Sequence, residues 1–354
     1  MFNLQNIPEH VFQIDETTLC IASKNLKAEN SELLQLKIPR KLTLSPEDEG
    51  RSKENDFKML AGLYTKNRVY QTDILNDNKI LTSEDKLTGL QVYKLNDEST
   101  SDELISELKN IPWKTPNFAV NRQKTKVICS KCNHEPLKLL DINVGKCFKD
   151  IKHPFHTINI LPVEVGIKSD PCTSNNITCE FLSSDLIGIL NMNNACLFLH
   201  DIRTENSFSM LPENDEKHSK EFWTLSSYDL FVNSNYFGIL SNCGNFYIYD
   251  IRNNKTVLKH KSLNVPLVSN NRIKLKFAND NLFSISGFDS DVHIFNVRDE
   301  SFNVVFKHDG HHQKKEAGDS LNYVNDHIWL TNIGDKFLLS ICDNKSLHCW
   351  EFNE

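Results

Sequence analysis

The sequence predicts an all-β fold in which residues 1–354 form one domain, a β-propeller of seven blades. Three observations support this prediction: a hairpin pattern recurs along the chain, it recurs about every 50 residues, and helical patterns are scarce. A chain of 354 residues would otherwise predict more than one domain. A closed ring of repeats can hold this length in a single unit.

The clearest copy of the repeat covers residues 282–296. An apolar run at 282–286 leads into a Gly/Asp-rich turn at 287–291, and a second alternating run follows. Period-two alternation around such a turn predicts a β-hairpin, and the Phe, Ile and Val content favours strand over helix. Similar hairpins are predicted at 237–250 and 337–351.

The last position of each second run marks one blade. The seven marks are Leu36, Tyr93, Leu140, His200, Tyr249, Phe295 and Trp350. The copies at Leu36 and Leu140 are weak by themselves, and we assign them because a blade is due there. The mean spacing of about 52 residues exceeds the roughly 40–45 of a compact repeat, which indicates inserted loops.

Four polar insertions account for the extra length, at about 44–58, 97–110, 203–221 and 313–326. Within the second, residues 101–108 are expected to form about two helical turns with Ser101 or Asp102 as the cap. Phe208, Met210, Leu211 and Tyr323 are the apolar residues of these loops that we assign as candidate partner anchors.

The two ends of the chain are expected to meet in one blade. Because the last mark lies close to the C-terminus, the last blade lacks its outer strand, and residues 2–7 are expected to supply it. Strands near 10–14 and 18–22 then begin the first blade. Closing the ring in this way removes the free sheet edge that would otherwise invite aggregation.

Composition excludes several classes of function. The formal net charge is −7, from 40 basic and 47 acidic side chains, which disfavours direct binding to nucleic acid or anionic membranes. The first residues do not resemble a signal peptide, and no apolar run reaches the roughly 18 residues of a membrane span. We therefore expect a cytoplasmic protein whose ten cysteines are free thiols.

Four stretches of the chain resemble the WD repeat-containing protein 73 family: residues 32–39 leading to 55–58, 285–289, 306–311, and 327–350. The resemblance implies a WD40-type propeller without catalytic activity or cofactor. It implies protein partners, namely the endonuclease subunits of the Integrator RNA-processing complex (snRNA processing) and an associated assembly factor, with tubulin and the spindle as the alternative. It also implies cytoplasmic residence, with the mitotic spindle pole and a partial nuclear pool as further expectations.

The chain departs from the general WD pattern, in which a turn Asp, a strand Ser or Thr, an upstream His and a Trp form a polar network. The positions that we assign to the blade framework are Tyr249, Asp250, Asp289, Phe295, His311, Ser340 and Trp350. Blade six keeps Asp289 but has Phe295 in place of Trp, and blade seven has Asn344 at the turn. Replacing Trp350 with alanine is expected to cost about 3–5 kcal/mol if its side chain is buried.

One cluster has the residue types of a metal site. Cys129, Cys132 and His134, with Cys147 further on, offer the ligands that zinc prefers. The second Cys-x-x-Cys of a complete motif is missing, so we interpret the segment as a hairpin turn and assign no metal. His308, His311 and His312, with His327 nearby, are interpreted as the segment entering the last blade.

The sequence predicts a non-catalytic scaffold for protein–protein interaction. It contains no phosphate-binding glycine loop, no nucleophile elbow and no zinc-protease motif, so we assign no catalytic or cofactor-binding residue. Two alternatives stay open. One is an enzyme whose residues gather from several blades around the channel, and the other is a peptide reader with Arg and Lys converging at the channel mouth.

Overall fold

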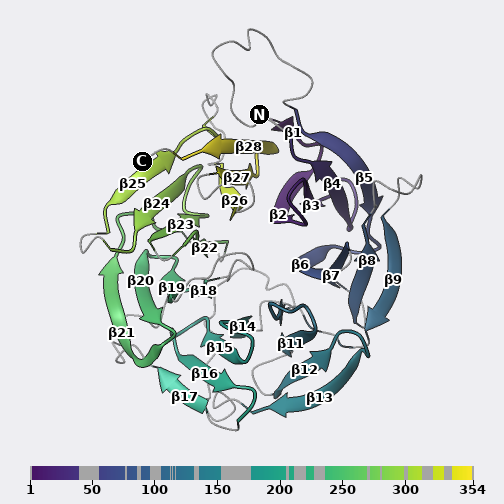
Figure 1. Ribbon diagram of the computed structural model, residues 1–354. Helices are drawn as coiled ribbons and strands as arrows, with labels where there is room; N and C mark the ends of the chain where they lie inside the picture. Colours follow the sequence, from purple (N-terminus) through teal and green to yellow (C-terminus); the bar gives the residue numbers. More distant parts are fainter. Residues whose placement is uncertain are drawn as a thin grey trace.

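A computed structural model confirms the all-β, seven-bladed ring (Figure 1). Seven four-stranded antiparallel sheets surround a central channel, and the two chain termini lie at the same blade. The structure describes residues 2–39, 56–75, 78–85, 89–95, 105–111, 113, 115, 117–130, 135–152, 177–204, 207–210, 221–226, 236–268, 272–279, 281–298, 302–312, 322–330 and 337–352.

The strands of blades one to three are β2 (Ile7–Gln13), β3 (Thr18–Lys24), β4 (Ser31–Lys37) and β5 (Lys58–Tyr64); β6 (Val69–Leu75), β7 (Lys79–Glu84), β8 (Leu90–Lys94) and β9 (Ser106–Ile111); and β10 (Asn117–Val120), β11 (Lys126–Ser130), β12 (Leu137–Asp141) and β13 (Lys146–Ile151). Those of blades four and five are β14 (Ile177–Phe181), β15 (Leu186–Asn191), β16 (Leu197–Asp201) and β17 (Ser207–Met210); and β18 (Trp223–Leu225), β19 (Tyr236–Ser241), β20 (Asn245–Asp250) and β21 (Asn253–Ser262). Those of blades six and seven are β22 (Lys274–Phe277), β23 (Leu282–Ser286), β24 (Val292–Asn296) and β25 (Val304–His308); and β26 (Val324–Trp329), β27 (Phe337–Cys342), β28 (Ser346–Glu351) and β1 (Phe2–Asn3).

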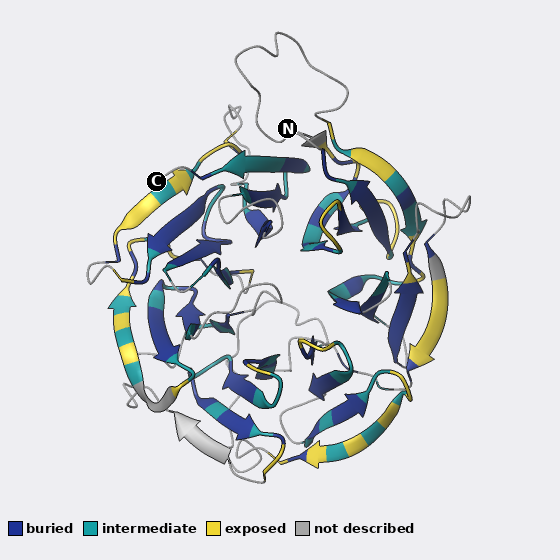
Figure 2. Cartoon of the chain, viewed as in Figure 1, coloured by how far each residue is buried: buried dark blue, intermediate teal, exposed yellow. Residues whose placement is uncertain are grey.

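Burial explains why the middle strands carry the sequence signal. Every residue of β23 is buried, and six of the seven residues of β3 are, because both faces of a middle strand pack against neighbouring blades. Outer strands such as β13 alternate between exposed and half-buried positions, except that Ile151 at the end of β13 is buried. Figure 2 shows the buried middle strands and the more exposed outer rim of the ring. All seven sequence marks lie on the third strand of a blade, from Leu36 on β4 to Trp350 on β28.

The ring closes through the N-terminal strand, as the sequence predicts. Phe2 and Asn3 pair with Leu347 and Ser346 of β28, and the Leu4 N–H donates to the Lys345 carbonyl at 2.8 Å. The closing strand is shorter than the predicted segment 2–7, because Ile7 already begins β2 of blade one.

The predicted helix at 101–108 is wrong over 106–108, which lie in a strand, and residues 101–104 lie outside the described residues. Ser106 to Ile111 form β9, the outer strand of blade two, with Leu90 paired to Ile111. The blade needs a fourth strand at this point, and sheet pairing overrides the helical propensity of the segment. The predicted loop 203–221 likewise contains β17, and the loop 313–326 runs into β26. Residues 40–55, most of the loop 44–58, lie outside the described residues.

Trp350 is half-buried and not enclosed, which lowers the expected cost of removing it. Its ring stacks on His308 at 4.3 Å and on Phe306 at 5.3 Å between ring centroids. We expect Trp350→Ala to reduce the free energy of unfolding by about 2 kcal/mol, below the 3–5 kcal/mol of a fully buried aromatic residue. Urea titration of the variant beside the wild type measures this difference. A loss above about 4 kcal/mol would contradict the half-buried placement.

Candidate functional site in the central channel

The first strand of each blade faces the central channel (Figure 1). The channel holds a cavity of about 980 Å³ whose lining includes residues of β2, β6, β14, β22 and β26. β22 has the sequence Lys-Leu-Lys-Phe, in which leucine and phenylalanine are buried and the two lysines are partly exposed. Alternation along such strands therefore places charged side chains in the cavity.

Asp326 and Lys276 form an ion pair in the channel. Lys276 Nζ lies 3.7 Å from Asp326 Oδ1, the Val11 N–H donates to Oδ2 at 3.2 Å, and the His327 N–H donates to Oδ1 at 2.9 Å. Burial disfavours the ionised carboxyl, but Lys276 and Lys274 together hold the pKa of Asp326 below its ordinary value. Asp326 is therefore a carboxylate that already has its partners.

Two other carboxyls of the channel, those of Glu180 and Asp73, have fewer partners than Asp326, and their pKa values are raised. Burial raises the pKa of Glu180 on β14 to about 8, the nearby Asp73 adds to this, and Lys276 and Lys274 oppose it. Burial also raises the pKa of Asp73 on β6 to about 6, although Lys124 opposes the shift and the Ile74 N–H donates to Oδ1 at 2.7 Å. Among the described residues, Glu180 has neither a hydrogen-bond nor an ion-pair partner.

Uncharged polar groups of the same cavity also lack partners. Gln13, at the end of β2, is 5% exposed, and its Nε2 and Oε1 atoms make no hydrogen bond within the described part of the chain. The same holds for the Thr72 hydroxyl on β6. Buried polar atoms are almost always hydrogen-bonded in folded proteins. These three atoms are enclosed by protein, so they are not exposed to the open space of the cavity.

Basic residues do converge on the channel, as the peptide-reader alternative requires, but acidic residues accompany them. An Arg68 guanidinium nitrogen lies 2.7 Å from Glu9 Oε1, and Arg272 donates to Asn325 Oδ1 at 3.3 Å. A lining of mixed sign does not favour a purely anionic ligand. The described channel residues give no positive evidence of catalysis.

Blade seven contains a polar network built around His311. The ring nitrogens of His311 lie 2.6 Å from Ser346 Oγ and 2.8 Å from Ser340 Oγ, and the Asn344 side-chain oxygen accepts a hydrogen bond from the Ser346 N–H. Asn344 therefore takes the place that an Asp has in the general pattern. Both nitrogens of His311 are occupied, which is typical of a structural histidine.

A second histidine network joins blades six and seven, and sequence reasoning did not find it. The buried His327 on β26 lies 2.7 Å from Ser284 Oγ and 2.8 Å from Ser286 Oγ, both on β23. Trp329 Nε1 donates to Ser284 Oγ at 2.8 Å. The only sequence signal is that both serines occupy alternate positions of an otherwise apolar strand.

The remaining framework positions lie in turns and in the core. Asp289 contacts His293 Nε2 at 3.2 Å and accepts a hydrogen bond from the Asp291 N–H. Tyr249 is fully buried and stacks on Phe237 with the ring centroids 5.1 Å apart, and Phe295 is buried in the same way against Phe283. Asp250 accepts two hydrogen bonds from the Arg252 guanidinium.

The candidate zinc ligands are only partly described. Cys129 is buried on β11, and burial together with the neighbouring Cys147 raises the pKa of its thiol. The Cys147 thiol, on β13, donates to the Lys149 carbonyl and to Asp150 Oδ1. Cys132 and His134 lie outside the described residues.

Two other groups of potential ligands come within 4.8 Å of one another, namely His308 with His311 and His348, and Asp289 with Asp291 and His293. His311 is engaged by its two serines. Asp291 pairs with Lys307 at 2.5 Å and with His312 at 2.6 Å. We assign no metal to either group.

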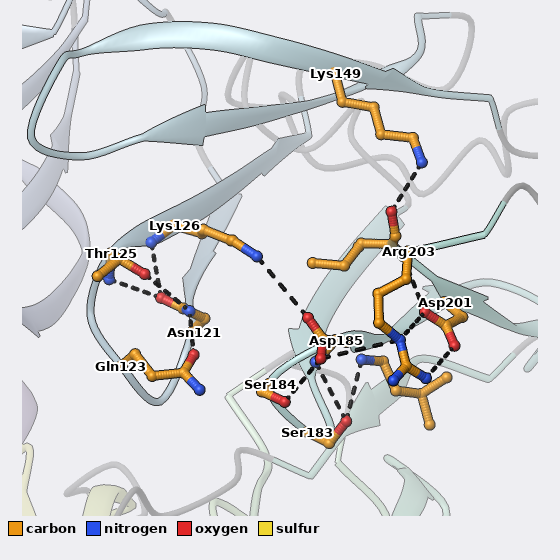
Figure 3. Close-up of polar contacts among 12 residues, drawn as sticks. Asn121, Gln123, Thr125, Lys126, Lys149, Ser183, Ser184, Asp185, Asp201 and Arg203 are labelled. Atoms are coloured by element: carbon orange, nitrogen blue, oxygen red, sulfur yellow. Dashed lines mark hydrogen bonds and ion pairs between the residues drawn. The ribbon is translucent and has the colours of Figure 1, made fainter.

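The junction of blades three and four forms a second surface feature (Figure 3). Lys126 Nζ lies 3.9 Å from Asp185 Oδ1, and Lys149 Nζ donates to the Ile202 carbonyl at 2.9 Å, so these two lysines of blade three contact blade four.

A shallow groove lies beside this junction, on the rim of blade three. It includes Val144 and Phe148, which are 59% and 54% exposed.

The structure describes the candidate partner anchors only in part. Phe208 and Met210 lie on β17, but their side chains and the whole of Leu211 are outside the described residues. Tyr323 is half-buried against the apolar core between blades five and six, and its N–H donates to Asp343 Oδ1 at 2.9 Å. Its role as an anchor stays a prediction.

No described helix is long and apolar enough to cross a membrane. No protein-family model matches the chain. The chain is 25% identical over 365 residues to the Integrator complex assembly factor WDR73 of the zebrafish Danio rerio, which covers 99% of this chain and 92% of the relative. The similarity and the seven blades confirm the resemblance to the WD repeat-containing protein 73 family and support a scaffold for protein interaction.

Proposed function

We propose that this chain is an assembly scaffold that holds the endonuclease subunits of the Integrator complex, together with an associated assembly factor, in the cytoplasm. The observation that carries the proposal is the end-to-end similarity to a relative named as an Integrator complex assembly factor. The fold supports it, because a rigid ring offers two faces and a rim for partners.

A pull-down of the tagged full-length chain from native cytosol tests this function. Quantitative mass spectrometry is expected to find the Integrator endonuclease subunits and one further assembly factor in near-stoichiometric amounts. The untagged chain is the control for nonspecific capture. Recovery of tubulin without Integrator subunits would overturn the proposal in favour of a spindle-associated propeller.

The proposed location is tested in the same cells. Fractionation of interphase cells is expected to place most of the chain in the cytoplasm, with a smaller nuclear pool. Enrichment at spindle poles in mitosis would be compatible with a cytoplasmic scaffold. A chain found almost entirely in the nucleus would contradict assembly in the cytoplasm.

A further inference from the structure

The groove on the rim of blade three brings exposed apolar side chains together with lysines. It is lined by the ends of two hairpins of this blade, β10–β11 and β12–β13, through Thr125, Lys126, Asp141, Val144, Lys146 and Phe148. Val144 is 59% exposed and Phe148 is 54% exposed. Large apolar side chains that share one surface and stay open to solvent are typical of interaction sites.

Phe148 is the extra residue of a β-bulge in the outer strand β13. Cys147 pairs with Leu140 of β12, and Lys149 pairs with Leu139, so Phe148 has no pairing partner on that strand. A bulge re-aims the side chain of its extra residue. The exposure of Phe148 is therefore built into the pairing of the blade.

The bulge by itself does not mark a binding site, because it recurs around the ring. Leu108 on β9 and Leu258 on β21 are likewise the extra residues of bulges, and they are 49% and 47% exposed. Phe148 differs from them because it lines a groove together with a second exposed apolar residue and two lysines.

The turn that carries Val144 is held in place by hydrogen bonds. The Asp141 carboxylate accepts hydrogen bonds from the N–H groups of Asn143 and Val144. The Gly145 N–H donates to the Asp141 carbonyl at 2.7 Å. Lys109 of the neighbouring blade donates to the Asn143 carbonyl at 3.5 Å. A surface that is already ordered loses little conformational entropy when a partner binds.

The groove is basic, although the whole chain has a formal net charge of −7. The Asp141 carboxylate is engaged by N–H groups of its own turn. Lys146 is exposed, and its ammonium group has no hydrogen-bond or ion-pair partner among the described residues. Lys126 Nζ lies 3.9 Å from Asp185 Oδ1 (Figure 3), and Lys109 adds a further ammonium group beside the turn. These charges favour a partner of opposite sign.

We propose that this groove docks an acidic segment of a protein partner. One large apolar side chain of the segment packs against Val144 and Phe148. The Asp or Glu residues that flank it pair with Lys126 and Lys146. A volume of about 400 Å³ is at the lower end for a ligand pocket, which suits a short segment and not a folded domain. The inference rests on the proposed scaffold function and specifies where, and by which chemistry, the ring contacts a partner.

The test uses three capped pentapeptides: Asp-Glu-Phe-Glu-Asp, Asp-Glu-Ser-Glu-Asp and Lys-Lys-Phe-Lys-Lys. Isothermal titration of the full-length chain at pH 7 measures their affinities. We expect the first peptide to bind at least about tenfold more tightly than either of the others, because it alone supplies both the apolar side chain and the negative charge. Raising the ionic strength should weaken its binding, since ion pairs at a surface are screened by salt.

Two substitutions in the groove and two matched controls locate the binding. Phe148→Ala and Lys146→Glu are each expected to lower the affinity for the first peptide about tenfold. Leu258→Ala removes the extra residue of the bulge on β21, and Lys27→Glu reverses an exposed lysine in the turn after β3. Both controls are expected to keep the wild-type affinity. A thermal melt of each variant establishes that it is folded.

Three results would overturn the inference. The first is equal affinity for the three peptides, or no binding by the folded wild type. The second is an equal loss of affinity in the groove variants and in the matched controls. The third is a dimer of the wild type that Phe148→Ala dissociates in sedimentation equilibrium, because a second copy of the chain would then cover the groove.

Pull-downs with the same variants separate this inference from the scaffold function. If the wild type and Phe148→Ala recover Integrator subunits equally while no peptide binds, the groove inference fails and the scaffold function stands. If the acidic phenylalanine peptide binds with the expected preference but no Integrator subunit is recovered, the scaffold function fails and the groove is a docking site for another protein.

Discussion

Replacing Phe283 with alanine is expected to reduce the free energy of unfolding by about 3–5 kcal/mol. Phe283 is fully buried on β23 and lies at the centre of the apolar core between blades five and six. Its ring stacks on Phe246 at 4.6 Å and on Phe295 at 5.0 Å, and meets Phe302 edge-on at 5.9 Å between ring centroids. Removing it would leave a cavity shared by two blades, and both would loosen.

Urea titration at neutral pH measures this loss. Phe148→Ala is the matched control, because the same substitution is then made on the rim strand β13, where the side chain is 54% exposed. The control is expected to change stability by about 1 kcal/mol or less. If the two variants lose similar amounts, Phe283 does not occupy the core between the blades.

Much of the ring could be predicted from the sequence, because middle strands are buried on both faces. The hairpin at 282–296 became β23 and β24, and the weak marks at Leu36 and Leu140 lie on β4 and β12. Outer strands gave no such signal. β9 has the sequence Ser-Glu-Leu-Lys-Asn-Ile, and its residues 107–110 are exposed, so no apolar alternation distinguishes it from a polar helix.

The channel site could not be predicted, since its residues come from strands far apart in the sequence. Asp73, Glu180 and Lys276 belong to blades two, four and six, and only ring closure brings them to one cavity. A local signal does exist. Glu180 and Lys276 each lie between two apolar residues of a short strand, and Asp73 lies between Thr72 and Ile74. Without the ring, that signal does not say which charges meet.

Lowering the pH from 7 to 5 is expected to destabilise the fold by several kcal/mol. Burial lowers the pKa of His327 to about 3. Burial and nearby histidines lower the pKa of His311 to about 2, and burial lowers those of His10, His308 and His348 to about 4. In the unfolded chain each titrates near its ordinary value of about 6.5. The unfolded chain therefore binds more protons below that pH, and stability falls as the pH decreases.

Two carboxyls act in the opposite direction. The pKa values of Glu180 and Asp73 are raised to about 8 and about 6, so the folded chain holds extra protons there and gains stability as the pH falls from 8 towards 4. At pH 8 Glu180 dominates, but at pH 7 each of the five histidines is about a quarter protonated in the unfolded chain, and together they already balance the two carboxyls. Stability is therefore expected to be greatest near pH 7, and urea midpoints measured from pH 8 to 5 locate the maximum.

His327→Gln isolates one contribution to this profile. A neutral amide cannot take up a proton, so the variant is expected to lose about 2 kcal/mol of the difference in stability between pH 7 and pH 5. It should also be less stable at pH 7, because the glutamine side chain cannot bridge Ser284 and Ser286 as the ring does. Phe283→Ala controls for general destabilisation, since it removes no titratable group and should keep the full pH dependence. An unchanged pH dependence in His327→Gln would mean that His327 is already solvated or charged in the folded ring, and the junction of blades six and seven would then need a different polar contact to hold it.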